Sequence, residues 1–520
     1  MKSNWMNVIS SYLFLHSPLR SLLQACTVRM PEPLNKLYVI RYGRILPGPL
    51  TCFIIALLIF LHCGILPSRS ISAEPLTSPD KINYPRLEFR IQQAERVELE
   101  NGMILFYLQD RELPLVSISA MVRTGSMYDP QGKEGLAELT AYLMRTGGTK
   151  NFSSAEIDER LDKLAASPSL SMSLDSASIA FSFLKDDLDA SLDLLSQIIR
   201  TPAFEEKKIQ LALALKNEEL RRTADNPQKL AFREFNRLLY PDDPRGRYMT
   251  TSSLENIRRD DLIDFHRSYF FPSNMMIAVT GDISKEEAVK KIMQYFGSWG
   301  QARHAVDPAP PPKKTNHGVF YINKQLPQST VVSGEFTISK NDPDYYAFSV
   351  LDFIVGSGGF RSRIFSAVRN HEGLAYSAGS FYRARSNYGI FGTYAFTKTT
   401  STVQSLHLIN DILRDTASGS IKPDELEWAK KSILNSFIFS FELPHQIAAQ
   451  QVLIEYEKLP ADYLISYRKK IETVTGEDVK RVAAAHLNEK RRLMLILGNT
   501  DEFGKLPEEW GQPVLIQPNL

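Results

Sequence analysis

The feature that most constrains the fold of this chain is an internal repeat. Two segments, residues 85–297 and 318–510, follow the same order of expected elements. Residues 298–317 separate them, and this stretch is rich in proline and has no apolar periodicity, as is typical of a linker. A repeat of this size predicts two duplicated domains joined by a Pro-rich hinge linker.

Each segment begins with alternating apolar residues that a proline interrupts, at Pro114 and at Pro327, which predicts two strands. An Asp-Pro pair, an apolar helix and a Gly-Gly pair follow in both segments. Further strands, two helices and a closing helix, turn and strand complete each one. This mixture predicts an α+β fold in which each domain has a mixed or antiparallel sheet with helices packed on one face.

Residues 1–73 are expected to be an N-terminal extension with a signal peptide. Arg41 and Arg44 precede an apolar run at residues 51–66, and small residues up to Ala73 follow it. This is the order of a secretion signal, and about 16 residues are fewer than the roughly 20 that a spanning helix needs. We expect a secreted, periplasmic protein that begins near Glu74 and has no stable membrane insertion. An uncleaved anchor is the alternative.

Composition excludes some classes of function. Lys and Arg number 61 and Asp and Glu number 59, so charge gives no reason to expect nucleic acid as a partner. All three cysteines, Cys26, Cys52 and Cys63, precede the expected cleavage site. A chain that begins near Glu74 therefore has no disulfide, no thiolate metal site and no cysteine nucleophile.

Residues 135–149, GLAELTAYLMRTGGT, predict a short amphipathic helix. Glu138 and Tyr142 are four residues apart and share one face. Two ligands at that spacing commonly hold a metal, yet neither residue is a histidine. The simplest interpretation is that Glu138 is a solvated or hydrogen-bonded helix residue.

From residue 87 to 503 the layout resembles the pitrilysin, insulinase and mitochondrial-processing-peptidase family of zinc peptidases, the inverzincins. In catalytic members the helix carries H-x-x-E-H, with two zinc-binding histidines and a general base. The resemblance places this motif at residues 138–142, where both histidines are replaced and Ala141 stands at the base position. The third ligand position falls on Glu219 or its neighbour Glu218. Such oxygen ligands suit magnesium or calcium better than zinc, so we expect no metal and no other cofactor in this chain.

A second family signature lies in residues 360–381, FRSRIFSAVRNHEGLAYSAGSF. Arg369 and Tyr376 match an Arg and a Tyr of the family that stand seven residues apart, in a stretch that ends in Leu-Ala-Tyr. The resemblance implies that they donate to substrate carbonyls and stabilise the charge that develops during peptide hydrolysis. The alternative is that Arg369 forms a surface ion pair and Tyr376 is a half-buried strand residue.

The glycine-rich stretch GSGGF, residues 356–360, precedes this signature. It lacks the Lys-Ser/Thr that follows a phosphate-binding loop. The resemblance instead implies a flexible loop that lines the substrate cleft, so Gly358 and Gly359 are expected to approach the peptide.

Some bacterial members of this family divide the work between two chains, one with H-x-x-E-H and one with the Arg and Tyr. This chain resembles the second kind. We expect this chain to be the non-zinc subunit of a heterodimeric metallopeptidase and to be inactive alone. Its homologous partner is expected to carry H-x-x-E-H and the zinc, and the complex is expected to hydrolyse peptides or small proteins. The alternatives are an inactive scaffold or peptide-binding protein of the same fold, and a peptidase with an unusual metal site.

Overall fold

The computed structural model describes residues 92–300, 309–311, 315–487 and 491–519. The expected signal segment lies outside the described residues, and so does most of the expected linker. Residues 87–520 form one compact unit. Among the described residues, no helix has both the length and the apolar character needed to cross a membrane.

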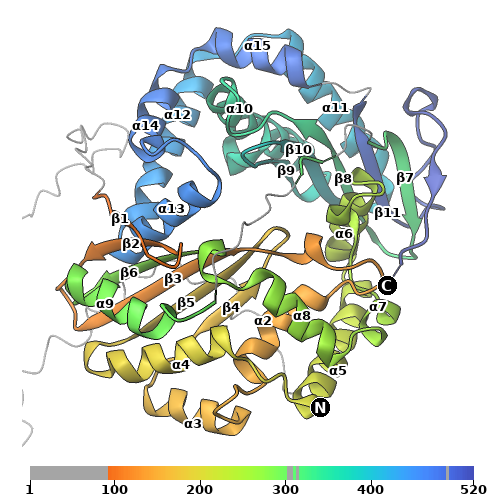
Figure 1. Cartoon of the computed structure of the whole chain (residues 1–520). Coiled ribbons are helices and arrows are strands. Elements are labelled where there is room, and N and C mark those ends of the chain that lie inside the picture. Colours follow the sequence, from red (N-terminus) through yellow and green to blue (C-terminus); the bar gives the residue numbers. More distant parts are fainter. Residues whose placement is uncertain (1–91, 301–308, 312–314, 488–490, 520) are drawn as a thin grey trace, which may run out of the picture. The chain divides into compact units, whose positions relative to one another are not determined.

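The first half of this unit forms a six-stranded mixed sheet in the order β1-β2-β6-β3-β5-β4 (Figure 1). Strands β2 and β6 are parallel and the other neighbours are antiparallel. Its strands are β1 (Glu95–Glu98), β2 (Ile104–Gln109), β3 (Leu115–Arg123), β4 (Ser169–Met172), β5 (Ser176–Leu184) and β6 (Met275–Gly281).

The second half has the order β12-β7-β11-β8-β10-β9, and its strands from β7 to β9 repeat the topology of the strands from β2 to β4. The edge strand differs, because β12 is parallel to β7 whereas β1 is antiparallel to β2. Strands β7 and β11 are parallel, as β2 and β6 are in the first sheet. The predicted duplicated α+β fold is therefore confirmed. The strands of the second sheet are β7 (Gly318–Asn323), β8 (Gln328–Thr337), β9 (Ala375–Ala384), β10 (Gly389–Lys398), β11 (Leu493–Gly498) and β12 (Val514–Leu515).

The helices also follow a common order in the two halves. The first half contains α2 (Leu136–Thr146), α3 (Ser154–Lys163), α4 (Leu188–Arg200), α5 (Glu206–Ala224), α6 (Pro227–Leu239), α7 (Thr251–Glu255), α8 (Arg259–Tyr269) and α9 (Lys285–Phe296). The second half contains α10 (Tyr345–Asp352), α11 (Thr402–Ser418), α12 (Pro423–Ile438), α13 (Pro444–Tyr456), α14 (Tyr463–Thr473) and α15 (Gly476–His486).

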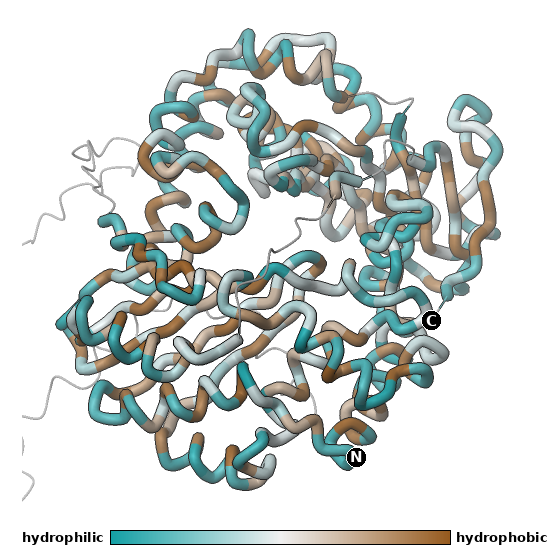
Figure 2. Tube along the Cα trace, in the orientation of Figure 1, coloured by the Kyte–Doolittle hydropathy of each residue, from teal (hydrophilic) through white to brown (hydrophobic). Residues whose placement is uncertain are grey.

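Alternating side chains build the main core of each half. On β3 the buried residues Val116, Ile118, Ala120 and Val122 alternate with half-buried ones, as the period of a strand requires. They pack against apolar residues of α2, α4, α8 and α9. The helices that cover the sheets carry hydrophilic residues on their other sides (Figure 2).

Each half gives one helix to the opposite face of the other half's sheet. Helix α6 of the first half packs on β8 and β11, where Leu230 and Phe235 are buried against Leu495. Helix α13 of the second half packs on β2, β3 and β6, where Val452 is buried against Met276. This reciprocal helix exchange is visible in Figure 1.

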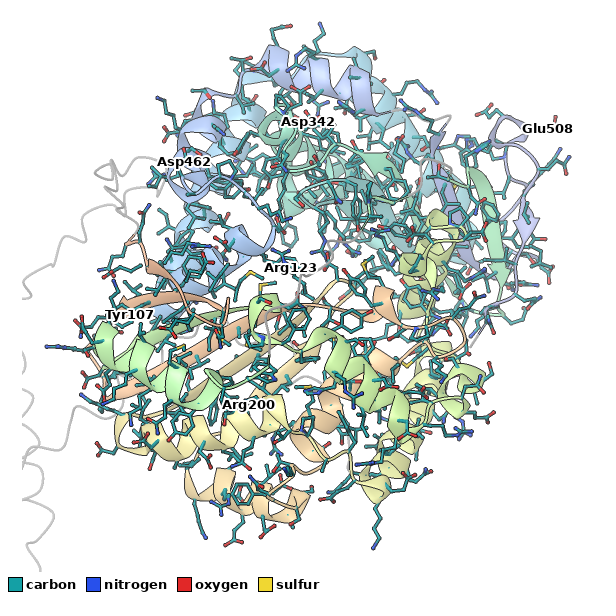
Figure 3. The ribbon with its side chains drawn as sticks, in the orientation of Figure 1. Tyr107, Arg123, Arg200, Asp342, Asp462 and Glu508 are labelled. Atoms are coloured by element: carbon teal, nitrogen blue, oxygen red, sulfur yellow. The ribbon has the colours of Figure 1, made fainter. Side chains whose placement is uncertain are left out.

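Polar contacts hold the exchanged helix α13 at the end of β3. Arg123, which is labelled in Figure 3, donates from Nη1 to the carbonyl oxygen of Tyr456 at 2.8 Å, and its guanidinium lies over the Tyr456 ring. The Tyr456 hydroxyl donates to the carbonyl oxygen of Asp175 at 2.6 Å. Burial of each large apolar side chain between the halves stabilises the fold by about 1.5–3 kcal/mol. Each half therefore depends on the helix that the other half supplies.

Candidate functional site

Helix α2 is the predicted degenerate zinc helix. Its face toward the core is apolar, and Ala141 is 3% exposed, which removes the base position from solvent. Glu138 and Tyr142 lie on the outer side, with the Glu138 side chain 35% exposed. Asp129 accepts from the backbone nitrogens of Gly135 and Ala137, both at 2.8 Å, at the start of the helix. Burial raises the pKa of Asp129 to about 7.

An ammonium group lies between the two carboxylates that match zinc-ligand positions. Lys216 of α5 donates from Nζ to Glu138 at 3.0 Å and to Glu219 at 2.8 Å. The Lys216 side chain is 20% exposed. Burial opposes its charge, but Glu138 and Glu219 outweigh burial and raise the pKa of Lys216 above its usual value. An internal cation thus joins α2 to α5.

These residues do not fit zinc. Zinc favours histidine and cysteine ligands, whereas Glu138, Tyr142 and Glu219 offer oxygen only. The Lys216 ammonium lies between two of those oxygens and would have to leave before a metal could bind. Within the described ranges, no three His, Cys, Asp or Glu side chains are grouped so that they could hold a metal ion.

Arg369 lies in the last turn of a π-helix, Phe365–His371. A second π-helix, Phe353–Ser357, follows α10. The first half has the regular helix α3 before the matching strand β4, so, among the residues that the structure describes, these wider turns occur in the half that carries the Arg and Tyr. Short π-helical turns are rare and occur often at functional sites.

Tyr376 is the second residue of β9, which is an edge strand of the second sheet. Ala375 pairs with Thr397 and Ser377 pairs with Phe396, so Tyr376 is an extra residue in a β-bulge. A bulge redirects a side chain out of the regular alternation of a strand. Tyr376 is accordingly 76% exposed, although it is a large aromatic residue.

The structure brings Arg369 and Tyr376 together. The guanidinium carbon of Arg369 lies 5.6 Å from the centre of the Tyr376 ring, 4.9 Å from that of Phe365 and 5.6 Å from that of Phe360. Among the described residues, no carboxylate forms an ion pair with Arg369. Arg363 differs, because it binds Glu425 through two hydrogen bonds of 3.0 and 2.8 Å.

Two polar contacts position the strand that carries Tyr376. Ser380 of β9 donates to the Asp352 carboxylate at 2.6 Å, and Thr397 donates to the carbonyl oxygen of Leu374 at 2.6 Å. Burial raises the pKa of Asp352 to about 6, although hydrogen bonds from Ser380 and Ser357 favour its charged form.

The predicted glycine pair lies in the turn before Arg369. Gly358 is packed closely, since a side chain there would come within 2.5 Å of Trp428. Gly359 has φ +70° and faces open space, so glycine suits this position for its conformation. The turn presents Phe360, which is 69% exposed, beside Arg369.

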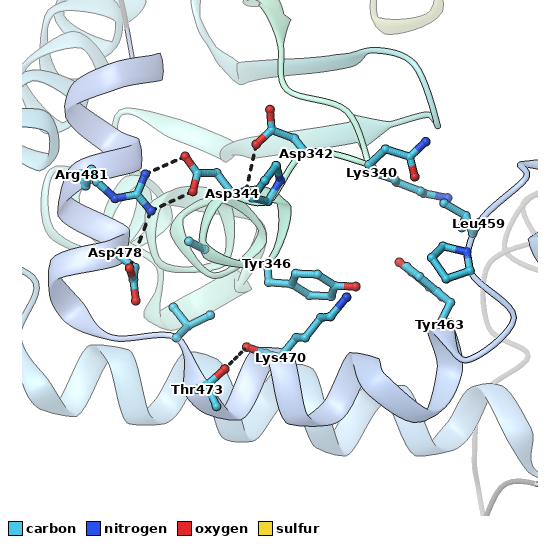
Figure 4. A pocket seen from close by; sticks show the side chains of 15 residues that line it. Lys340, Asp342, Asp344, Tyr346, Leu459, Tyr463, Lys470, Thr473, Asp478 and Arg481 are labelled. Carbon is cyan, nitrogen blue, oxygen red and sulfur yellow. Dashed lines mark hydrogen bonds and ion pairs between the residues drawn. The ribbon is translucent and has the colours of Figure 1, made fainter.

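A separate pocket of about 490 Å³ lies at the start of α10, and none of the predicted site residues lines it. Asp344 there accepts two hydrogen bonds of 2.7 Å from Arg481, and Lys470 extends along Tyr346 (Figure 4). Three acidic and three basic side chains line the pocket, so their opposite charges balance and the pocket offers no concentrated charge.

Two similar α+β halves, one with a helix that has no histidine at residues 138–142 and one with an adjacent Arg and Tyr, define a duplicated peptidase-like protein. The chain belongs to peptidase family M16. Residues 106–251 match the model described as Insulinase (Peptidase family M16), and residues 256–433 match the one described as Peptidase M16 inactive domain. The predicted family is therefore confirmed.

Some relatives of the chain are named zinc proteases, and one is named a non-peptidase homolog. The chain is 26% identical over 372 residues to an uncharacterized zinc protease of Rickettsia bellii, which covers 71% of this chain and 87% of the relative. It is 26% identical over 345 residues to the non-peptidase homolog YmxG of Helicobacter pylori, which covers 64% and 77%. A peptidase M16 inactive domain from Pseudomonas fluorescens has a similar fold, with a TM-score of 0.73, 23% identity and coverage of 78% and 98%.

Three elements of the site were missed from the sequence. Lys216 precedes Glu219 by three residues, and that spacing was a signal for the ion pair on α5. The aromatic residues around Arg369 were visible in the sequence, but their contacts with it were not. The bulge at Tyr376 had no signal, because bulges depend on how two strands pair.

Proposed function

We propose that this protein is the non-zinc subunit of a two-chain metallopeptidase. Its partner is a homologous chain that carries H-x-x-E-H and the zinc, and Arg369 and Tyr376 of this chain bind the peptide. The observation that carries the proposal is the exposed Tyr376 beside an Arg369 that no carboxylate of the described residues neutralises.

The surroundings of Arg369 suit a substrate-binding role. A bidentate carboxylate, like the one that Glu425 gives to Arg363, would use the donors of the guanidinium. Three aromatic rings stabilise the cation of Arg369 without using those donors in strong hydrogen bonds. They remain available for peptide carbonyl oxygens, and the Tyr376 hydroxyl adds one more donor.

In the part of the chain that the structure describes, the positions that match the family's zinc site offer no means of activating water. Ala141 stands where the family has its general base, and it is buried. The Lys216 ammonium pairs with Glu138 and Glu219 where a metal would need free ligands. Alone, the chain should therefore be inactive toward peptides. Secretion to the periplasm, inferred from the apolar run at residues 51–66, is part of the same proposal.

The rival proposal is a scaffold or peptide-binding protein that never assists hydrolysis. The relative named a non-peptidase homolog favours it. The two proposals differ in what Tyr376 does, because a scaffold has no need of an exposed phenol beside an unpaired arginine. Kinetics of a complex with an H-x-x-E-H relative therefore separate them.

The test is to mix the chain with an H-x-x-E-H relative from the same organism and follow cleavage of quenched fluorescent peptides. Tyr376→Phe removes one hydroxyl and should lower kcat by roughly 10²–10³, or about 3–4 kcal/mol. Tyr382→Phe is the matched control, because it removes a hydroxyl of the same strand that donates to Ile338. Glu138→Ala should leave the rate within about twofold, because on this proposal Glu138 forms an ion pair with Lys216 and does not contact the peptide.

Two results would contradict the proposal. One is full activity of the Tyr376→Phe complex together with an inactive Glu138→Ala complex, which would place the chemistry on α2. The other is a stable complex in which the chain adds nothing to hydrolysis by its partner, which would favour the scaffold.

A further inference from the structure

Phe360 is an exposed aromatic residue held in a defined place. It lies in the short 3₁₀ turn Gly359–Arg361 and is 69% exposed. Its ring centre is 4.8 Å from that of the buried Phe365, and the Asn370 side chain donates to its carbonyl oxygen at 3.3 Å. Aromatic side chains that neighbouring contacts hold in place at the surface often act as anchors in binding.

The turn that carries Phe360 is anchored on both sides. Gly358 packs against Trp428 so closely that a Cβ atom would lie 2.5 Å from its ring, and Arg361 lies over the same ring at 5.0 Å. These contacts hold the turn in place and direct the Phe360 ring toward Arg369, 5.6 Å away. The ring is thus pre-organised, which lowers the entropy cost of binding.

We infer that Phe360 is a specificity-determining residue that receives a large apolar or aromatic side chain of the bound peptide. The inference rests on the proposed function, because the peptide carbonyl next to that side chain is the one that Arg369 and Tyr376 bind. Two exposed rings, Phe360 and Tyr376, each have their centre 5.6 Å from the guanidinium carbon of Arg369, so both lie next to the group that binds the peptide. An aromatic side chain of the peptide packs well against the exposed ring of Phe360.

The charge of Arg369 also selects against basic side chains. Cations bind aromatic faces, but here Arg369 already occupies that place against Phe360, Phe365 and Tyr376. A lysine or arginine of the peptide would meet a like charge at short range. The expected preference is therefore phenylalanine or leucine over lysine at one position of the peptide.

The test uses fluorescent peptides in which a single position of an otherwise alanine and serine background is Phe, Leu, Lys or Glu. Equilibrium binding to the chain alone is measured by polarisation, and kcat/KM is measured in the two-chain complex. Phe360→Ala should weaken binding of the Phe peptide and lower its kcat/KM by about 10–100-fold, and should change the Lys peptide by less than about threefold. Phe360→Leu should restore most of the preference. Phe439→Ala, which truncates a 60% exposed phenylalanine elsewhere, is the matched control.

The two readouts separate this inference from the proposed function. If the complex shows no hydrolysis but Phe360→Ala still weakens binding of the Phe peptide selectively, the inference stands and the proposed peptidase role fails. If hydrolysis depends on Tyr376 but Phe and Lys peptides respond equally to Phe360→Ala, the proposed function stands and the inference is wrong. Unchanged binding and unchanged kcat/KM in Phe360→Ala also overturn it.

Discussion

Replacing Lys216 by methionine tests whether the Lys216 ammonium stabilises the contact between α2 and α5. Methionine keeps most of the volume of the lysine stem and a similar helix propensity, so packing changes little. The substitution leaves Glu138 and Glu219 facing each other without the ammonium that contacts them at 3.0 and 2.8 Å. The variant should be less stable because two attractions are lost and one repulsion appears.

The magnitude follows from the exposure of the three groups. An exposed ion pair contributes about 0.2–1 kcal/mol. The Lys216 side chain is 20% exposed, which places its pair with Glu138 at the upper end, whereas Glu219 is 58% exposed and more strongly screened. We expect a loss of about 1–2 kcal/mol at low ionic strength, measured by urea unfolding. At 1 M salt the loss should shrink, because the screening length falls to about 3 Å.

Lys207→Met is the matched control, since it makes the same change on an exposed turn of α5. A double-mutant cycle with Glu138→Gln should give a coupling energy of about 0.5–1 kcal/mol. The reasoning would be refuted by a Lys216→Met variant as stable as the Lys207→Met control, or by zero coupling to Glu138. Either result would mean that the ammonium contributes nothing to joining the two helices.

Three further predictions concern pH, metal and processing. The pKa of Asp352 is raised to about 6, so the folded state favours the neutral carboxyl group. The stabilising contribution of that group is therefore complete below about pH 4 and is lost as the pH rises through about 6. Asp352→Asn should remove up to about 3 kcal/mol of the pH dependence of the free energy of unfolding between pH 4 and 7, measured with urea, and parallel curves for the variant and the parent would contradict this. Elemental analysis of the dialysed chain should find far less than one zinc per molecule; one zinc would mean that Glu138 and Glu219 bind metal with a further ligand. Intact mass of the native protein should correspond to a start near Glu74, and a mass that includes residues 51–66 would reject cleavage.

Much of the fold could be predicted because its signals are local. Strand alternation, the breaks at Pro114 and Pro327 and the repeated order of elements depend on near neighbours in the sequence. The helix exchange was not predicted. The sequence of α6 fixes which of its faces is apolar, with Leu230 and Phe235 on it, but not which sheet that face will cover. That choice depends on contacts between residues far apart in the chain.

In the candidate site too, contacts between residues close in the sequence could be predicted, and contacts between distant residues could not. The positions of Arg369 and Tyr376 came from a motif and are seven residues apart, so their proximity needs only a helix, a turn and a strand. The contact of Lys216 with Glu138 joins residues 78 positions apart and depends on how α2 meets α5. The roles of Arg369 and Tyr376 in catalysis, and those of Gly358 and Gly359 in peptide binding, stay predictions.

The helix exchange has a consequence for the order in which the protein can fold during synthesis. The last strand of the first sheet, β6, ends at Gly281, but the helix that covers its outer face ends at Tyr456. At roughly 5–20 residues per second, a ribosome needs about 10–40 s to make the chain between these points. During that time Phe106 and Met276 lack the apolar side chains of α13 that bury them in the complete chain. The N-terminal half therefore cannot reach its native state first, and a fragment that ends in the linker should aggregate rather than fold.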